Sequence, residues 1–396
     1  MKNILKNIEG DRAIWALVAI LALLSFLPVY SASTNLVYVA NNGTTTFHLF
    51  KHAFLLSCGF LIIYGVHKIP YRYFSGGSVL MLPLVVALLI FTLTKGTTIG
   101  GANASRWIQI PIIGVGFQTS TLAGLVLMVY VARYLARNKE KVITFKESFI
   151  QLWLPIAITL VFILPANFST TAIIFSMILV VTFIGGYPIK YLASVVGIGV
   201  LVLTLFVLTA KAFPNAMPNR VDTWISRIEN FSNKNVEEGY QVEKAKIAIA
   251  SGGIKGRGPG KSVQKNFLPQ SSSDFIFAII VEEFGLAGAL TVILLYFSLL
   301  IRFLVAAKKA NTIFATLLII GVGLPIIFQA IINMAVAVNL FPVTGQTLPL
   351  ISSGGTSIWM TCFAIGIILS VTADKEKEKS IESEENPLDI LHETIG

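Results

Sequence analysis

The sequence predicts an all-α polytopic membrane protein with about ten transmembrane helices. Of its 396 residues, 55% are hydrophobic and only 13% are charged, whereas a soluble globular protein carries about 25% charged residues. Apolar runs of about 20 residues, the length that crosses a bilayer, recur along most of the chain. One helical bundle would use nearly all of these runs, which excludes a large soluble domain.

Ten apolar segments define the predicted spans. They centre on residues 13–31, 49–66, 77–95, 117–136, 148–165, 170–186, 189–210, 274–303, 312–337 and 356–372. The first lacks a small-residue cleavage site followed by a soluble domain, so we interpret it as a span and not as a signal peptide. The prediction is one membrane domain over residues 1–373, followed by a charged tail at 374–396 that we expect to be disordered.

The distribution of lysine and arginine predicts the orientation. Basic residues precede the first span and follow the second, fourth, sixth, eighth and tenth, whereas the loops at 32–47 and 339–355 contain none. The positive-inside rule therefore places both termini in the cytoplasm. The loop at 211–273 then lies outside, and its basic character favours an anionic partner there. Loops beyond about 60 residues largely escape the rule.

Two short helices are predicted inside this long loop, at residues 219–230 and 240–250. The first is amphipathic, and the second stops at a Ser-Gly-Gly sequence. Both could lie flat at the lipid interface, or they could simply cover the end of the bundle.

Asp274 stands directly before the eighth apolar run, after three serines. An aspartate at the start of a helix can cap free N–H groups. The alternative is a general base, whose charge the helix dipole favours and burial opposes. A base of this kind contributes about 10²–10⁴ to a rate. The residues alone leave both interpretations open.

The glycine-rich loop before Asp274 resembles a P-loop only superficially. The required glycine five positions before Gly260 is replaced by Lys255, and no strand precedes the loop. Its backbone N–H groups, with Lys255, Arg257, Lys261 and Lys265, could instead cradle a pyrophosphate. A flexible, solvated turn is the alternative.

Two acidic residues, Glu282 and Glu283, fall about two turns into the eighth span. Ionisable groups inside a span are costly and mark functional sites by default. For at least one of them we favour a structural pairing with Arg, Lys or a backbone N–H group.

Two further polar segments are predicted on the same side as Asp274. The uncharged, Gly/Pro-rich residues 339–357 could form a cavity wall or a plain interhelical loop. Arg106 beside Trp107 suits an interfacial anchor, which we favour on spacing alone, and also suits a phosphate contact.

Cysteine and histidine give no sign of a metal centre. Cys58 and Cys362 lie in apolar segments and are expected to be buried hydrophobic residues. His48 and His52 are one helical turn apart, but no other ligand type lies near them in the sequence.

These motifs together resemble the SEDS family (shape, elongation, division and sporulation), the FtsW/RodA-type peptidoglycan polymerases. The resemblance covers nearly the whole chain and is carried by residues 252–285 and 339–357, and more weakly by 102–110 and 116–120. The start Gly10-Asp-Arg12 is more similar to the FtsW branch.

The resemblance implies an inverting glycosyltransferase that polymerises lipid II at the outer face of the bacterial inner membrane, for septal synthesis in cell division. It implies that Asp274 deprotonates the acceptor 4-hydroxyl while undecaprenyl pyrophosphate leaves. A class B penicillin-binding transpeptidase and other division proteins are the implied partners, and Mg²⁺ or Mn²⁺ could accompany the pyrophosphate. We expect substrate contacts from Arg106, Lys255, Arg257, Lys261, Gln264, Lys265, Gln346, Ser352 and Ser353, and a cavity lined by Glu282, Glu283, Trp107 and Gln118.

The sequence departs from the family pattern in the fourth span. A glutamate and a lysine are expected there, and Thr121 and Gly124 stand in their places. Which cations replace this pair is therefore open. A precursor flippase and a non-catalytic division scaffold remain as alternative functions.

Overall fold

The computed structural model describes residues 9–38, 44–96, 107–110, 115–212, 239–268 and 270–384. In this part of the chain, nine helices are long and apolar enough to cross a membrane, and a tenth apolar helix is shorter. The predicted fold class, a polytopic helical membrane protein, is confirmed. The helix predicted at 219–230 lies outside the described residues.

The helices follow the predicted spans closely. They are α2 (Arg12–Tyr38), α3 (Thr45–Val66), α4 (Arg72–Lys95), α5 (Thr119–Arg137), α6 (Phe145–Ser148), α7 (Leu154–Ile163), α8 (Phe168–Ile184), α9 (Ile189–Ala212), α11 (Tyr240–Gly252), α12 (Ile276–Lys309), α13 (Ile313–Ala337) and α14 (Gly355–Glu384). A π-helical turn, η1 (Phe149–Trp153), joins α6 to α7, and a 3₁₀ turn, η2 (Gln264–Asn266), precedes α12.

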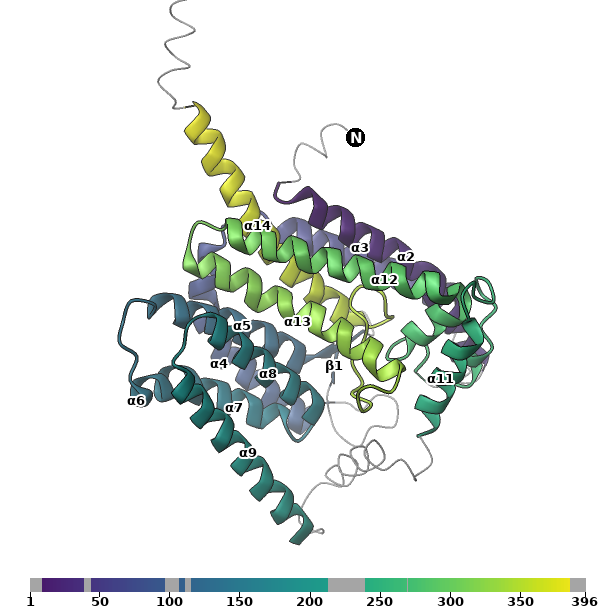
Figure 1. Cartoon of the computed structure of the whole chain (residues 1–396), viewed down its shortest axis with the longest axis horizontal. Coiled ribbons are helices and arrows are strands. Elements are labelled where there is room, and N and C mark those ends of the chain that lie inside the picture. The colour runs from purple at the N-terminus through teal and green to yellow at the C-terminus, as the bar shows by residue number, and fades with distance from the viewer. Residues whose placement is uncertain are drawn as a thin grey trace, which may run out of the picture.

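The core of the bundle is formed by α5, α13 and α14, most of whose apolar windows are buried. By contrast, none of the apolar window of α9 is buried, and in Figure 1 this helix leans away from the others at the lower edge. An apolar helix that the rest of the chain leaves uncovered is suited to contact with lipid.

A small antiparallel sheet was not predicted. Strands β1 (Trp107–Ile110) and β2 (Val115–Gln118) pair so that Trp107 lies opposite Gln118. The backbone N–H of Gln118 donates to the hydroxyl of Thr356 at 3.2 Å, which joins the hairpin to the start of α14. The strands are four residues each, and the end of β2 overlaps the start of the span predicted at 117–136.

Two helix ends also differ from the prediction. The eighth span begins at Ile276, two residues after the predicted start. The last helix runs on to Glu384, so that the first part of the tail predicted to be disordered is helical. This extension is rich in lysine and glutamate, which favour helix.

One end of the bundle collects the polar segments. Figure 1 shows α11, the hairpin, the start of α12 and the loop after α13 at the same end. The predicted helix at 240–250 is confirmed as α11, which packs against α12 through Val242, Ala245 and Ala248. We call this the α11 end.

Candidate active site

Asp274 lies in the turn that leads into α12, at the α11 end. The helix begins at Ile276 and its N-cap residue is Phe275, one residue after Asp274, so Asp274 does not occupy the N-cap position considered for it. The side chain of Asp274 is half-buried, whereas Phe275 and the first turn of α12 are fully buried. A carboxylate in this position can meet a substrate while the backbone behind it is fixed.

The loop after α13 passes directly over the Asp274 carboxylate. Gly345 in this loop has φ +70, and a Cβ atom there would lie 3.5 Å from Oδ2 of Asp274. A larger side chain at this position would therefore lie against the carboxylate, in a backbone conformation that favours glycine. The structure thus brings together Asp274 and the predicted cavity wall at 339–357.

Asn333 of α13 braces both sides of this contact. Its Nδ2 donates to the backbone carbonyl of Asp274 at 2.8 Å and to that of Gln346 at 2.7 Å. The side chain of Gln346 donates in turn to Thr170 of α8 at 3.0 Å. Asn333 was not predicted as a site residue, and its signal in the sequence was a side-chain amide in a mostly apolar span that also contains Gln329.

Ser352 and Ser353 join the same loop to the segment before Asp274. The buried hydroxyl of Ser352 donates to the carbonyl of Ser273 at 2.6 Å and accepts from the N–H of Leu348 at 2.7 Å. The N–H of Ser353 donates to the carbonyl of Ser272 at 2.9 Å. The Ser352 hydroxyl therefore joins the loop after α13 to the backbone just before Asp274.

Replacing Asn333 by alanine is expected to destabilise the protein by about 2–4 kcal/mol, because two part-buried carbonyl groups lose their donor. Thermal unfolding of the purified protein in detergent measures the change. Asn138→Ala is the matched control, since Asn138 lies beyond the far end of α5 and its side chain donates only one bond to Tyr134, at 2.9 Å. Equal stability of the two variants would contradict the bracing role.

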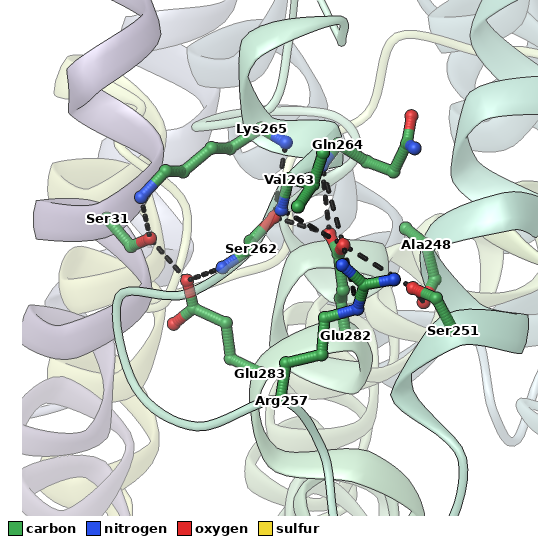
Figure 2. Close-up of polar contacts among 10 residues, drawn as sticks. All are labelled: Ser31, Ala248, Ser251, Arg257, Ser262, Val263, Gln264, Lys265, Glu282 and Glu283. Atoms are coloured by element: carbon green, nitrogen blue, oxygen red, sulfur yellow. Dashed lines mark hydrogen bonds and ion pairs between the residues drawn. The ribbon is translucent and has the colours of Figure 1, made fainter.

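Glu282 and Glu283 are buried within α12, and both carboxylates face the glycine-rich loop (Figure 2). Glu282 accepts from the N–H groups of Val263 at 3.0 Å and Gln264 at 3.2 Å, and from the Ser262 hydroxyl. Glu283 accepts from the N–H of Ser262 at 3.3 Å and from the Ser31 hydroxyl of α2. Both residues therefore pair with backbone N–H groups, as favoured from the sequence.

A break in α12 completes this contact. Gly285 has φ 63 and ψ −159, which interrupts the helix and frees the carbonyl groups before it. The carbonyls of Glu282 and Glu283 accept from the N–H groups of Arg257 and Gly258, both at 2.9 Å. The predicted cradle of free backbone N–H groups is therefore wrong for these loop residues, because the protein's own oxygen atoms occupy them.

The basic side chains of the loop differ in exposure. Lys255 and Lys261 are exposed, and Arg257 forms an ion pair with Glu282 at 3.8 Å while 42% of its side chain stays exposed. Lys265 is half-buried and donates to the carbonyl of Gly260 at 2.7 Å and to Ser31 at 3.2 Å. The exposed side chains of Lys255, Arg257 and Lys261 could meet an anion, whereas the loop N–H groups bonded to Glu282 and Glu283 could not.

The remaining predicted residues lie elsewhere or outside the described part. Trp107 and Gln118 belong to the hairpin, and Arg106 lies outside the described residues. At Gly124, a Cβ atom would lie 3.1 Å from the side chain of Ile174 in α8, so a larger residue there would require this side chain to move. Thr121 is half-buried on the same helix.

A divalent cation would find little support from the residues that the structure describes. No group of three or more His, Cys, Asp or Glu side chains gathers among them.

A multi-span helical membrane protein, with a half-buried carboxylate framed by polar loops at one end of the bundle, is the class that the fold and site define. Residues 11–377 match the FtsW/RodA/SpoVE family model, described as "Cell cycle protein". The chain belongs to this family.

Curated relatives agree with this assignment. The chain is 31% identical over 373 residues to a "Probable peptidoglycan glycosyltransferase FtsW" of Nitrosomonas europaea, covering 92% of each protein. It is 30% identical to the protein of the same name from Enterococcus hirae, covering 96% of each.

The fold is shared with two solved proteins. A chain from a structure described as "Structural coordination of polymerization and crosslinking by a peptidoglycan synthase complex" has TM-score 0.69 at 24% identity, covering 92% of this chain and 98% of that one. The rod shape determining protein RodA of Thermus thermophilus has TM-score 0.65 at 22% identity, covering 92% and 97%.

Proposed function

We propose that this protein is a peptidoglycan glycosyltransferase that polymerises lipid II into glycan strands, with Asp274 as the general base. The observation that carries the proposal is the Asp274 carboxylate, which lies half-buried against Gly345 in a frame fixed by Asn333 and Ser352. Relatives that match more than nine-tenths of the chain bear the name peptidoglycan glycosyltransferase.

The reaction assigns one proton transfer to Asp274. The carboxylate accepts the proton of the acceptor sugar's 4-hydroxyl, and the freed oxygen attacks the anomeric carbon of the donor. A new C–O bond forms as the bond to pyrophosphate breaks, and undecaprenyl pyrophosphate leaves with the electron pair. Because the leaving group is anionic, exposed cations such as Lys255, Arg257 and Lys261 would stabilise it.

Topology and partners follow from the same proposal. Loop charges support cytoplasmic termini and an α11 end at the outer face of the bacterial cell membrane. The fold is similar to that of a chain from a peptidoglycan synthase complex, which supports a class B penicillin-binding transpeptidase as the partner. Septal synthesis during cell division is the role that the FtsW relatives favour.

The proposal is tested by reconstituting the purified protein, alone and with its transpeptidase partner, in liposomes with fluorescent lipid II. Glycan strands resolved on a gel are the expected product. A transporter would instead move lipid II between the leaflets without joining it, and a scaffold would do neither. Translocation without strands, or no change in lipid II, contradicts the proposal.

A further inference from the structure

The glycine-rich loop is attached to α12 by a reciprocal set of bonds. The carboxylates of Glu282 and Glu283 accept from N–H groups of residues 262–264, and their backbone carbonyls accept from the N–H groups of Arg257 and Gly258. Both ends of the segment 257–264 are thus held by two consecutive helical residues. Figure 2 shows Glu282 at the centre of this set.

The Glu282 carboxylate lies where a glycine-rich, basic loop could otherwise bind an external anion. Successive backbone N–H groups with a basic side chain form an anion-binding concavity. Here the Glu282 carboxylate is fully buried and accepts hydrogen bonds from two backbone N–H groups and the Ser262 hydroxyl. It also accepts a long bond of 3.4 Å from Ser251 and forms the ion pair with Arg257. A buried charge is tolerated only with such compensation.

This arrangement determines where the loop cations stand. Arg257 directs Nε toward Glu282 at 3.8 Å, and 42% of its side chain remains exposed. Its other guanidinium N–H groups can therefore contact a second anion, since Arg offers five donors. Lys261 follows in the held segment and is exposed.

We infer that Glu282 is a positioning residue for the donor pyrophosphate. Its carboxylate fills the amide nest of the glycine-rich loop, so that the phosphate contact is made by the side chains of Arg257 and Lys261 and not by backbone N–H groups. This inference rests on the proposed function. It also makes a structural claim, that the loop is held by an internal anion, which can be measured without turnover.

Hydrogen exchange with mass spectrometry on the full-length protein in detergent tests the structural claim. In Glu282→Gln, one oxygen that accepts N–H groups becomes an N–H donor, so exchange over residues 256–266 is expected to accelerate about tenfold or more. The helices α5, α13 and α14 should exchange as in the wild type. Glu147→Gln is the matched control, because Glu147 is exposed in the described structure and contacts Thr144, far from this loop.

Steady-state polymerisation of lipid II tests the positioning role. Glu282→Gln is expected to raise the KM for lipid II at least about fivefold with a smaller change in kcat, because the enzyme keeps Asp274. Arg257→Ala should raise KM similarly and leave loop exchange within about twofold of the wild type, because the nest stays filled.

Three results would overturn the inference. They are wild-type exchange of the loop in Glu282→Gln, acceleration spread equally over all helices, and a loosened loop with unchanged KM. Absence of polymerisation by the wild type would reject the proposed function instead, and the exchange experiment would still decide whether Glu282 holds the loop.

Discussion

Gly285→Ala is expected to destabilise the protein by about 3 kcal/mol or more. Gly285 has φ 63 and ψ −159, a conformation almost restricted to glycine, in which another residue costs about 1–3 kcal/mol. A Cβ atom there would also lie 2.4 Å from the backbone N of Gly256 and the carbonyl O of Ile254. Because both neighbours are backbone atoms, the strain cannot be relieved by a rotamer change, and overpacking adds about 1–3 kcal/mol.

Gly65→Ala is the matched control for this prediction. Gly65 lies in α3, and a Cβ atom there would have no described neighbour within 4 Å. In a helix interior this change stabilises by about 0.5–1 kcal/mol, and because Gly65 lies in the last turn of α3 we expect a smaller effect. Thermal unfolding of both variants in the same detergent gives the comparison. If Gly285→Ala unfolded at the temperature of Gly65→Ala, the close contact between the glycine-rich loop and the break in α12 would be wrong.

Asp274→Asn is expected to lower the rate of lipid II polymerisation by about 10²–10⁴, the usual contribution of a general base. The amide has the size of the carboxylate and cannot accept the proton of the acceptor hydroxyl. Because the backbone carbonyl of Asp274 accepts from Asn333, the surrounding frame should survive the change. Rates are measured from glycan formation with fluorescent lipid II at saturating concentration.

Asp374→Asn serves as the control for charge removal. Asp374 lies near the end of the last span, where it pairs with Arg72 at 3.9 Å. An exposed ion pair of this length contributes little to stability, so polymerisation should stay near the wild-type rate. A comparable loss in both aspartate variants would argue that net charge, and not the position of Asp274, controls activity.

The fold could be predicted because the bilayer dictates the length and composition of each span. Ten apolar segments corresponded to ten helices, including the short α8 at Phe168–Ile184. The β1–β2 hairpin was missed because strands of four residues carry too little alternation to separate from the next span.

The site could be predicted only in part, because its polar bonds join distant residues. Asn333 contacts the carbonyl of Asp274 across 59 positions, and no local pattern reports such a pair. The glycine-rich loop shows the same limit. Its composition indicated anion binding, and the carboxylate of Glu282 accepts from the N–H group of Val263, a bond between distant residues that the sequence does not report.

The most direct test of the catalytic account separates binding from chemistry in the Asp274→Asn variant. Lipid II affinity is measured by fluorescence on reconstituted protein, and strand formation is then followed in the same sample. If Asp274 is the general base, we expect a Kd within about twofold of the wild type, together with a polymerisation rate lowered by at least about 100-fold. Glycan strands formed at the wild-type rate by Asp274→Asn would contradict it.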